Sequence, residues 1–434
     1  MHGSDERHAL FVSYGGGHAA LLAPVAGELC RRQDWRVSVL GLTTGRRRYE
    51  VQGLRVLGFV DFLSADDSHA RELGERLTAD VDAVSSGVGA QETVAYLGLC
   101  MADLIDEVGE AQAWAAYNER GRHAFRPDRT MLRILSTLKP DVVVSTNSPK
   151  SERSALEVSA RLGIPTVMCP DLFCDPAWEI YKPLKADNYC VISHLAQENL
   201  VRHHGALADA VALTGHPAFD KSSVGGQREC RGRVAADLGI EMTGRCYVWA
   251  TSPDGIDPAH PPLGSSDSIA ALRELSASQS LVANRRTILV KPHPSEAAGP
   301  YQELLAGIPG VHVVPPGYDS NAVIRASDGV VVCSVSTLII DSLALGTATV
   351  AVGVRRPSLR SALPWEDIGV PFIDEREALR RFWARDDPFE MVPPRQLDLR
   401  VELGRLCSGA AVRVADVVAR VGGVPKSLES RQAQ

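Results

Sequence analysis

A short hydroxyl-rich turn in the C-terminal half of the chain carries residue types suited to binding a nucleotide diphosphate. The apolar run 329–333 predicts a buried strand, and Ser336 and Thr337 follow it before a helical pattern that stops at Gly346. The first N–H groups of a helix are unpaired and its dipole favours anions, so this turn could hold a diphosphate. Asp341, in the second turn of that helix, could reach a ribose hydroxyl. An ordinary strand–helix–strand unit with a Ser336 or Thr337 cap explains the pattern equally well.

Two further strand ends in this half carry groups that suit phosphate. Lys-Pro-His-Pro at 291–294 follows the apolar run 287–290. Two prolines stiffen this loop, so Lys291 and His293 are aimed in advance, and both side chains suit a phosphate oxygen. Ser252, just after the run 246–250, is a weaker candidate of the same kind. Simple turns remain the alternative at both places.

A glycine loop near the N-terminus carries a candidate general base. Three glycines, which include Gly16 and Gly17, follow the apolar run 9–13 and precede His18 at the start of a helical pattern over 19–32. Glycines permit a tight turn and close approach of a ligand. An imidazole titrates near neutral pH, so His18 could take a proton from an attacking hydroxyl. A plain glycine turn with an exposed histidine is the alternative.

Other polar residues also follow predicted strands of the N-terminal half. Gly215 and His216 end the last of these strands, where they could contact a ligand or form a hinge. Glu152, Asp171 and Asp175 lie at neighbouring strand ends and are the alternatives to His18 as base. Helix capping and turn formation also explain these acids.

Strands and helices alternate along nearly the whole chain, which is typical of βαβ units and parallel sheets in an α/β fold. We expect a first sheet from the apolar runs 9–13, 36–40, 141–145, 166–168, 188–192 and 210–213. We expect a second sheet from the runs 246–250, 287–290, 311–314, 329–333 and 348–352. The predicted domains are 1–218, with a helical insertion over about 64–130, and 219–395. Residues 396–434 should form a C-terminal helix that packs back toward the first domain, and then a flexible tail.

Composition narrows the function classes. With 434 residues the chain should hold two domains, and a net charge of −7 argues against a general nucleic-acid binder. Nine scattered cysteines favour a reducing, cytoplasmic environment and indicate neither a disulfide framework nor a metal site. The first residues, which include Asp5, Glu6 and Arg7, are polar and do not resemble the apolar core of a signal peptide, and we expect no apolar run long enough to span a bilayer.

Taken together, these segments resemble the GT-B superfamily, which includes many glycosyltransferases and the UDP-N-acetylglucosamine 2-epimerases. The glycine loop looks like the first loop of lipid-linked and cell-wall N-acetylglucosaminyltransferases, which implies His18 as base. Thr-Gly-His-Pro at 214–217 looks like the T-G-N/H-P segment of epimerases and lipid-A-disaccharide-synthase-like enzymes. The segment 334–341 looks like the epimerase S-G-G-x-x-x-E helix start, with Asp341 in place of the ribose-binding glutamate.

Other motifs separate the members of this superfamily. The Lys-Pro-His-Pro loop and Ser336-Thr337 also look like the H-P and S-S/T motifs with which bacterial sialyl-, polysialyl- and Kdo-transferases hold the nucleotide phosphate. The acidic D/E-D/E-G motif of those families is not cleanly present: Pro-Asp-Gly at 253–255 is a partial match in the wrong domain. The H-R-R-E segment of the epimerases is also missing, and residues 249–253 stand in its place.

The resemblance implies two Rossmann-like, doubly wound domains that face a central cleft. The donor, such as a UDP-sugar, would sit mainly on the C-terminal domain and the acceptor on the N-terminal one. We therefore expect a metal-independent glycosyltransferase that needs no cofactor and acts on a cell-surface, lipid-linked or small-molecule acceptor, as in polysaccharide biosynthesis. The alternatives are a 2-epimerase-like enzyme and a non-catalytic nucleotide-sugar-binding protein. Peripheral contact with a membrane and a homodimer are left open.

Overall fold

The chain forms two compact units in a computed structural model. The first unit comprises Met1–Asp220 and Gly409–Gln434, and the second comprises Lys221–Ser408. The structure describes residues 6–42, 45–78, 88–170, 172–176, 186–220, 225–242, 244–251, 286–293, 296–333, 336–354, 360 and 363–423. The chain therefore leaves the first unit once and returns to it near its C-terminal end.

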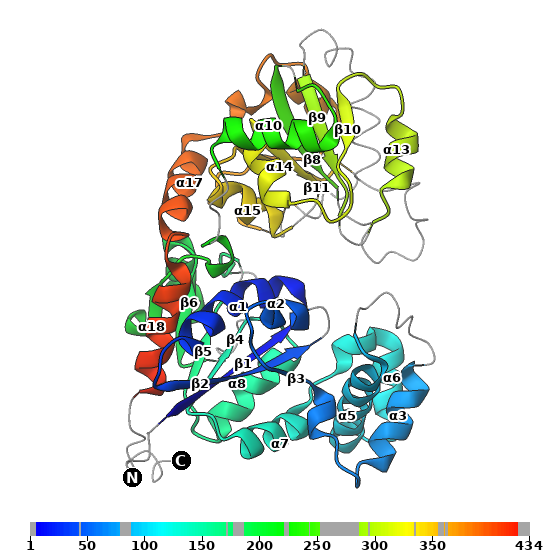
Figure 1. The fold of residues 1–434 in the computed structure, drawn as a ribbon, viewed down its shortest axis with the longest axis vertical. Coiled ribbons are helices and arrows are strands. Elements are labelled where there is room, and N and C mark those ends of the chain that lie inside the picture. The colour runs from blue at the N-terminus through cyan, green and yellow to red at the C-terminus, as the bar shows by residue number, and fades with distance from the viewer. Residues whose placement is uncertain are drawn as a thin grey trace. The chain divides into compact units, whose positions relative to one another are not determined.

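The first unit is built on a seven-stranded parallel sheet with the strand order β3-β2-β1-β4-β5-β6-β7 (Figure 1). Its strands are β1 (Arg7–Tyr14), β2 (Trp35–Leu42), β3 (Val56–Leu57), β4 (Val142–Ser145), β5 (Thr166–Met168), β6 (Asn188–Val191) and β7 (Val211–Leu213). The interior of β1 is buried along its whole length, as expected for a parallel sheet that is covered on both faces.

Helices cover both faces of this sheet. They are α1 (Gly16–Cys30), α2 (Arg46–Glu50), η2 (Phe59–Phe62), α3 (Ser68–Thr78), α5 (Ala90–Val108), α6 (Glu110–Arg120), η3 (Gly121–Ala124), α7 (Asp128–Leu138), α8 (Ser151–Arg161), α9 (His194–His204), η5 (Ala208–Ala210), η6 (Pro217–Phe219) and α18 (Ala410–Gly422). Leu10 and Val12 of β1 join the core beneath α5, α7 and α8, whereas Ala9 and Phe11 join the core beneath α1 and α18. Successive side chains of β1 point to opposite faces of the sheet and so contribute to the hydrophobic core on each face.

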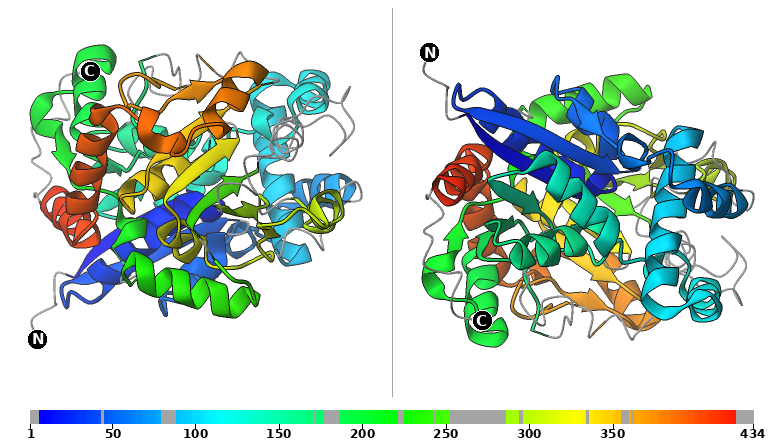
Figure 2. Two further views of the ribbon diagram at one scale, coloured as in Figure 1. Left: turned by 90° about the horizontal axis from the view of Figure 1, so that it is seen from above. Right: turned by 90° about the horizontal axis from the view of Figure 1, so that it is seen from below.

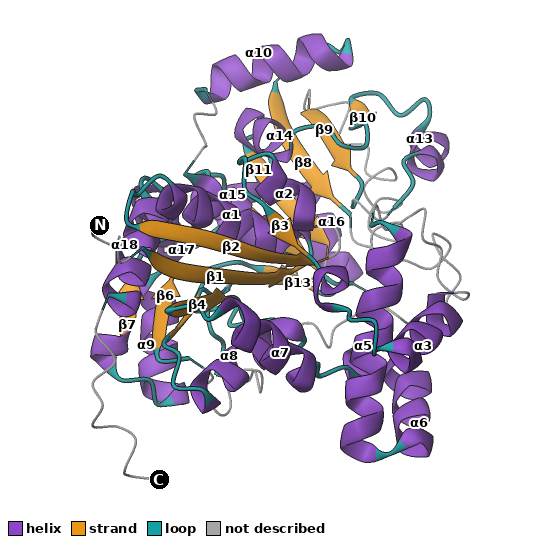
Figure 3. Ribbon diagram, turned by 60° about the horizontal axis from the view of Figure 1, so that its bottom comes forward, coloured by secondary structure: helices purple, strands orange, loops and turns teal. Residues whose placement is uncertain are grey.

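The described elements between η2 and β4 are helices, and α3, α5 and α6 among them form a group beside the first sheet (Figures 1 and 3). Asp103 joins two of the helices in this region: its Oδ2 accepts the backbone N–H of Thr130 at 2.8 Å, which ties α5 to α7. The side chain is buried, and burial raises the pKa of Asp103 to about 6. Compared with the unfolded chain, the folded protein therefore holds the proton of Asp103 more tightly.

This shift predicts a pH dependence of stability. An acid whose pKa is raised on folding stabilises the protein below its unfolded pKa of about 3.9, and that contribution is lost as the pH rises toward about 6. Near pH 7 we expect Asp103→Asn to have a higher free energy of unfolding than the wild type, by up to roughly 3 kcal/mol, and therefore a higher melting temperature. Near pH 4 the two proteins should differ little. Thermal melts at both pH values test this, and a variant destabilised most near pH 7 contradicts it.

The second unit carries a six-stranded parallel sheet with the order β10-β9-β8-β11-β12-β13. Its strands are β8 (Arg245–Ala250), β9 (Arg286–Lys291), β10 (Val311–Val313), β11 (Gly329–Cys333), β12 (Thr349–Val352) and β13 (Phe372–Ile373). Its helices are α10 (Gln227–Leu238), α13 (Gly299–Leu305), α14 (Ser320–Ala326), α15 (Leu338–Ala344), α16 (Arg376–Trp383), η8 (Pro388–Met391) and α17 (Pro394–Leu406). Helices α10 and α14 pack together on this unit (Figures 1 and 2).

The C-terminal helical pattern forms two helices, α17 in the second unit and α18 in the first. Helix α18 packs on α1, and its Val414 and Val418 are fully buried in the shared core. The Asp220 carboxylate accepts the N–H groups of Ala410 and Ala411, so it satisfies two of the unpaired donors at the start of α18. None of the described helices is both long and apolar enough to cross a bilayer.

Candidate functional site

Each sheet has one point at which the strand order reverses. In the first unit β1 lies between β2 and β4, and in the second unit β8 lies between β9 and β11. Open parallel sheets bind ligands at the carboxyl ends of the strands that flank such a point. The residues that follow β1 and β4, and those that follow β8, β9 and β11, are therefore the first places to look for a site.

The glycine loop after β1 sets the position of His18. Gly15 has φ +92°, a conformation that strains any other residue, and its carbonyl accepts the N–H of Ala19 at 3.1 Å. Helix α1 consequently begins at Gly16, three residues earlier than the sequence pattern predicted. Gly17 is exposed, and a Cβ added there would meet no atom within 4 Å. His18 thus lies in the first turn of α1 rather than ahead of the helix.

Glu152 lies beside His18, in the first turn of α8 after β4. It is 0 % exposed, and its Oε1 accepts the backbone N–H of Tyr14. Burial raises the pKa of Glu152, while the nearby His18 and the hydrogen bonds from Tyr14 and Ser148 act in the opposite direction. The carboxyl and the imidazole are therefore electrostatic neighbours, contributed by the two strands that flank the reversal of the first sheet.

Several buried polar atoms in this region have no hydrogen-bond partner among the described residues. They are His18 Nδ1, Glu152 Oε2, Thr146 Oγ1 and Ser151 Oγ. Buried polar groups are nearly always paired, so such atoms call for a polar ligand or ordered water. An acid and an imidazole that share this environment can accept and relay a proton.

The segment after β7 is firmly held. Gly215 has φ +79°, and its N–H donates to the Val191 carbonyl at 3.1 Å. His216 packs against Phe219 with 4.6 Å between the ring centroids, and burial lowers the pKa of His216 to about 4, so this ring is neutral near pH 7. Arg413 of α18 donates to the Thr214 carbonyl at 2.9 Å. A ligand-binding role for Gly215 and His216 stays a prediction.

The acids proposed as alternatives to His18 differ in position. Glu152 adjoins His18, as described. Asp175 follows β5, is buried, and has a backbone carbonyl 3.2 Å from His204 Nε2. Asp171 lies outside the described residues. Of these acids, Glu152 is the one for which the structure gives an interaction with His18.

In the second unit Lys291 and Asp341 lie within electrostatic reach of each other. Lys291 ends β9, and its carbonyl accepts the N–H of Thr251, which follows β8, at 3.0 Å. Burial lowers the pKa of Lys291, and the nearby Asp341 carboxylate opposes this. Asp341 lies in the first turn of α15, rather than the second, because this helix begins at Leu338. A half-buried cation and an acid thus share the carboxyl edge of the second sheet.

His293 is positioned by a small hydrogen-bond network that the sequence did not reveal. Its N–H lies 3.1 Å from both Thr251 Oγ1 and Glu296 Oε2, and the Thr251 hydroxyl also donates to Glu296. The Tyr301 hydroxyl donates to Glu296 Oε1 at 2.7 Å. Burial lowers the pKa of His293, and the Glu296 carboxylate opposes this. Glu296 therefore connects His293, Thr251 and Tyr301 through its two carboxylate oxygens.

We expect Glu296→Ala to destabilise the protein by about 1–3 kcal/mol, because the Thr251 and Tyr301 hydroxyls lose their acceptor and the His293 N–H loses one of its two. Glu296→Gln retains one carbonyl oxygen and should lose less. Thermal melts of the two variants, with exposed Glu303→Ala of α13 as control, check this. If the two Glu296 variants melt like the wild type, the network does not hold the loop.

The remaining candidates of the second unit are only partly described. Ser336 Oγ accepts the N–H of Leu338 at 3.3 Å, and Thr337 is exposed at the start of α15. Ser252, Pro294 and Ser334 lie outside the described residues. In the described part of the chain, no three His, Cys, Asp or Glu side chains are grouped so as to hold a metal ion.

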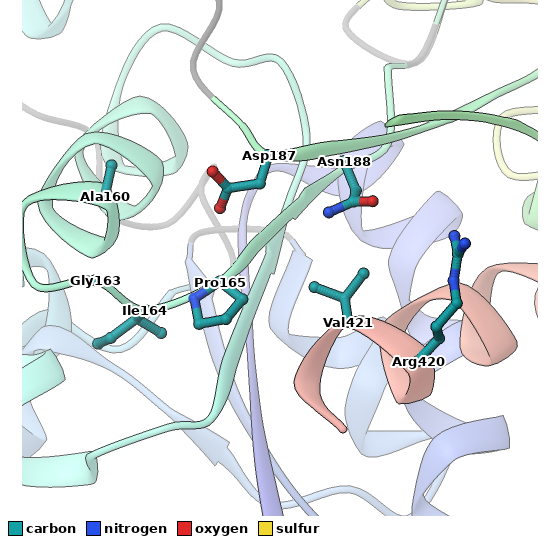
Figure 4. A pocket seen from close by; sticks show the side chains of 8 residues that line it. All are labelled: Ala160, Gly163, Ile164, Pro165, Asp187, Asn188, Arg420 and Val421. Carbon is teal, nitrogen blue, oxygen red and sulfur yellow. The ribbon is translucent and has the colours of Figure 1, made fainter. Parts of the chain in front are cut away.

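A pocket of about 500 Å³ in the first unit lies away from all these residues (Figure 4). Pro165 and Asn188, at the amino ends of β5 and β6, line it together with Arg420 and Val421 of α18. His18 and Glu152 follow the carboxyl ends of β1 and β4, at the opposite edge of the sheet. This pocket is therefore distinct from the candidate site.

Comparisons with known proteins agree with the fold. No model of a protein family matches the sequence, and neither does any curated protein. A UDP-GlcNAc 2-epimerase from Neisseria meningitidis, solved with UDP-GlcNAc, is similar with 12% identity and a TM-score of 0.53, over 95% of this chain and 100% of that one. The glycosyltransferase SnogD from Streptomyces nogalater has 18% identity and a TM-score of 0.54, over 94% and 99%. MurG from Acinetobacter baumannii has 15% identity and a TM-score of 0.52, over 95% and 99%.

These similarities extend over nearly the whole of each chain, and both units have the parallel sheets of a Rossmann-like domain. The protein therefore has the GT-B fold, as the order of its elements predicted. Solved structures with this similarity include both an epimerase and glycosyltransferases, so the fold is compatible with either activity.

Proposed function

We propose that this protein is a glycosyltransferase that moves a sugar from a nucleotide-sugar donor to an acceptor hydroxyl. The first unit would supply the base, His18, and the acid beside it, Glu152. The second unit would hold the donor through Lys291, His293 and the start of α15, with Asp341 on the ribose. Gly16 and Gly17 would border the reacting groups.

The observation that carries the proposal is that His18, in the first turn after β1, lies within electrostatic reach of buried Glu152, in the first turn after β4, at the reversal point of the first sheet. A base must take the proton from the acceptor hydroxyl as the new glycosidic bond forms. The imidazole becomes positively charged when it does so, and the adjacent carboxylate stabilises that charge. A buried carboxylate is effective here because few water molecules screen it.

The second unit offers the complementary chemistry. A leaving nucleoside diphosphate carries negative charge that must be stabilised as the bond to the sugar breaks. The Lys291 ammonium is suited to that task, and the bonds from the His293 N–H to Thr251 and Glu296 hold the residue that follows it in the Lys-Pro-His segment. Because burial lowers the pKa of His293, its ring would act as a neutral hydrogen-bond donor to a phosphate oxygen near pH 7.

Proton NMR of the protein with UDP-N-acetylglucosamine alone separates the transferase from the epimerase. A transferase leaves the configuration at the sugar C2 unchanged, whether or not slow hydrolysis occurs. Formation of the manno isomer without any acceptor would replace our proposal with the epimerase. Donor binding without turnover across a panel of acceptors would favour a non-catalytic binding protein.

A further inference from the structure

Tyr14 lies at the centre of a cationic and aromatic cluster in the first unit. Its N–H is held by Glu152, and the Lys150 ammonium lies over its ring at 4.4 Å from the centroid. This distance is typical of a cation–π contact. Tyr96 of α5 packs beside it with 5.7 Å between the ring centroids. Residues from β1, from the loop before α8 and from the helical segment therefore meet at Tyr14.

Arg122 of η3 adds a second cation to this cluster. Its guanidinium lies close enough to Tyr14, Tyr96 and Tyr117 to interact with their phenol groups. Burial by itself lowers the pKa of Arg122, but these phenol groups raise it overall, so the side chain is charged at every physiological pH. Two basic side chains thus flank Tyr14, whose backbone N–H is bound by Glu152.

Neither cation has a carboxylate partner among the residues that the structure describes. The ion pairs of the described arginines and lysines include neither Lys150 nor Arg122, although both are half-buried. Removing a charge from water is costly unless a counter-charge compensates. Aromatic faces compensate in part, and an anion bound between the two cations would complete the site.

We propose that the acceptor carries an anionic oxygen group, a carboxylate or a phosphate, which Lys150 and Arg122 bind while its hydroxyl meets His18. This rests on the proposed transferase function and narrows its acceptor to acidic sugars and sugar phosphates. Charge-assisted hydrogen bonds from a lysine and an arginine give such a group both affinity and orientation. The aromatic rings of Tyr14 and Tyr96 offer apolar surface to the sugar.

The test measures binding of three matched sugars to the full-length protein in the absence of donor. These are methyl glucoside, methyl glucuronide and methyl glucoside 6-phosphate, which share one ring and differ in charge. Saturation-transfer NMR titrations should give at least about tenfold tighter binding of one charged sugar than of the neutral one, as one charge-assisted contact provides. Which charged sugar binds better distinguishes a carboxylate acceptor from a phosphate acceptor.

Lys150→Met and Arg122→Gln should each weaken binding of the charged sugar about tenfold and leave the neutral sugar unaffected. Exposed Lys139→Met and Arg48→Gln are the matched controls and should bind like the wild type. Tyr14→Phe removes only the hydroxyl and should give a smaller loss. Melting temperatures verify that each variant is folded.

Equal binding of charged and neutral sugars, no binding of either charged sugar, or a charge preference that survives both substitutions would overturn the inference. Because no donor is present, these outcomes do not depend on turnover. A protein that binds nucleotide sugars but shows no charge preference would retain the proposed function and lose only this acceptor class. A preference for the charged sugar without any binding of nucleotide sugars would retain the anion-binding site and contradict the proposed transferase function.

Discussion

His18→Ala is expected to lower the turnover number by about 10²–10⁴-fold while the affinity for the donor stays near that of the wild type. The imidazole would act only when the acceptor hydroxyl loses its proton, whereas the proposed donor contacts belong to the second unit. Steady-state kinetics combined with donor titration measures the two effects separately. The comparison requires a donor and an acceptor that support turnover by the wild type.

Two further variants make this result specific. His203→Ala removes an exposed histidine at the end of α9 and should leave turnover unchanged. Glu152→Gln keeps an oxygen for the Tyr14 N–H but removes the negative charge beside His18, so turnover should fall while the protein remains folded. Near wild-type turnover of His18→Ala would show that this histidine is a bystander and would turn attention to Asp171 and Asp175.

The second large effect is expected at the loop after β9. His293→Ala and Lys291→Met should each weaken donor binding by roughly 1.5–3 kcal/mol, about 10–150-fold in Kd, because each would remove a proposed contact to a charged phosphate. The melting temperature should change little, since neither side chain belongs to the hydrophobic core of the second unit. Calorimetric titration with the donor measures the affinity directly.

His312→Ala is the matched control for His293→Ala. Both histidines are half-buried, and burial lowers the pKa of both, but His312 lies within β10 at the edge of the sheet. It should leave donor binding unchanged. Should His293→Ala instead lower the melting temperature without affecting the donor, the Lys-Pro-His loop would be a structural turn.

Periodicity and turn residues were sufficient to predict most of the fold. All eleven strands expected from apolar runs are present. The sequence missed β3 and β13, because strands of two residues leave no periodic pattern. It also placed the start of α1 at Ala19, because Gly16 and Gly17 have a low helix propensity. Gly15, with its positive φ, is the glycine that ends the loop.

The candidate site was less predictable because its contacts join distant parts of the chain. Glu152 was identified only as one of three acids, and its burial beside His18 depends on the pairing of β1 with β4. Glu296 was missed, since its partners Thr251 and Tyr301 come from other elements. Arg122 gave no signal either, because its contact with Tyr14 depends on how the helical segment folds onto the sheet.

The most direct test of nucleotide-sugar binding is a thermal-shift panel of UDP-, TDP-, GDP- and CMP-sugars. A ligand present at 100 times its Kd stabilises the folded protein by about 2.7 kcal/mol, so the correct donor should raise the melting temperature clearly. We predict that at least one UDP-sugar does so, and that the double variant Lys291→Met/His293→Ala loses the shift. No shift with any nucleotide sugar, or an equal shift in the double variant, would contradict this account.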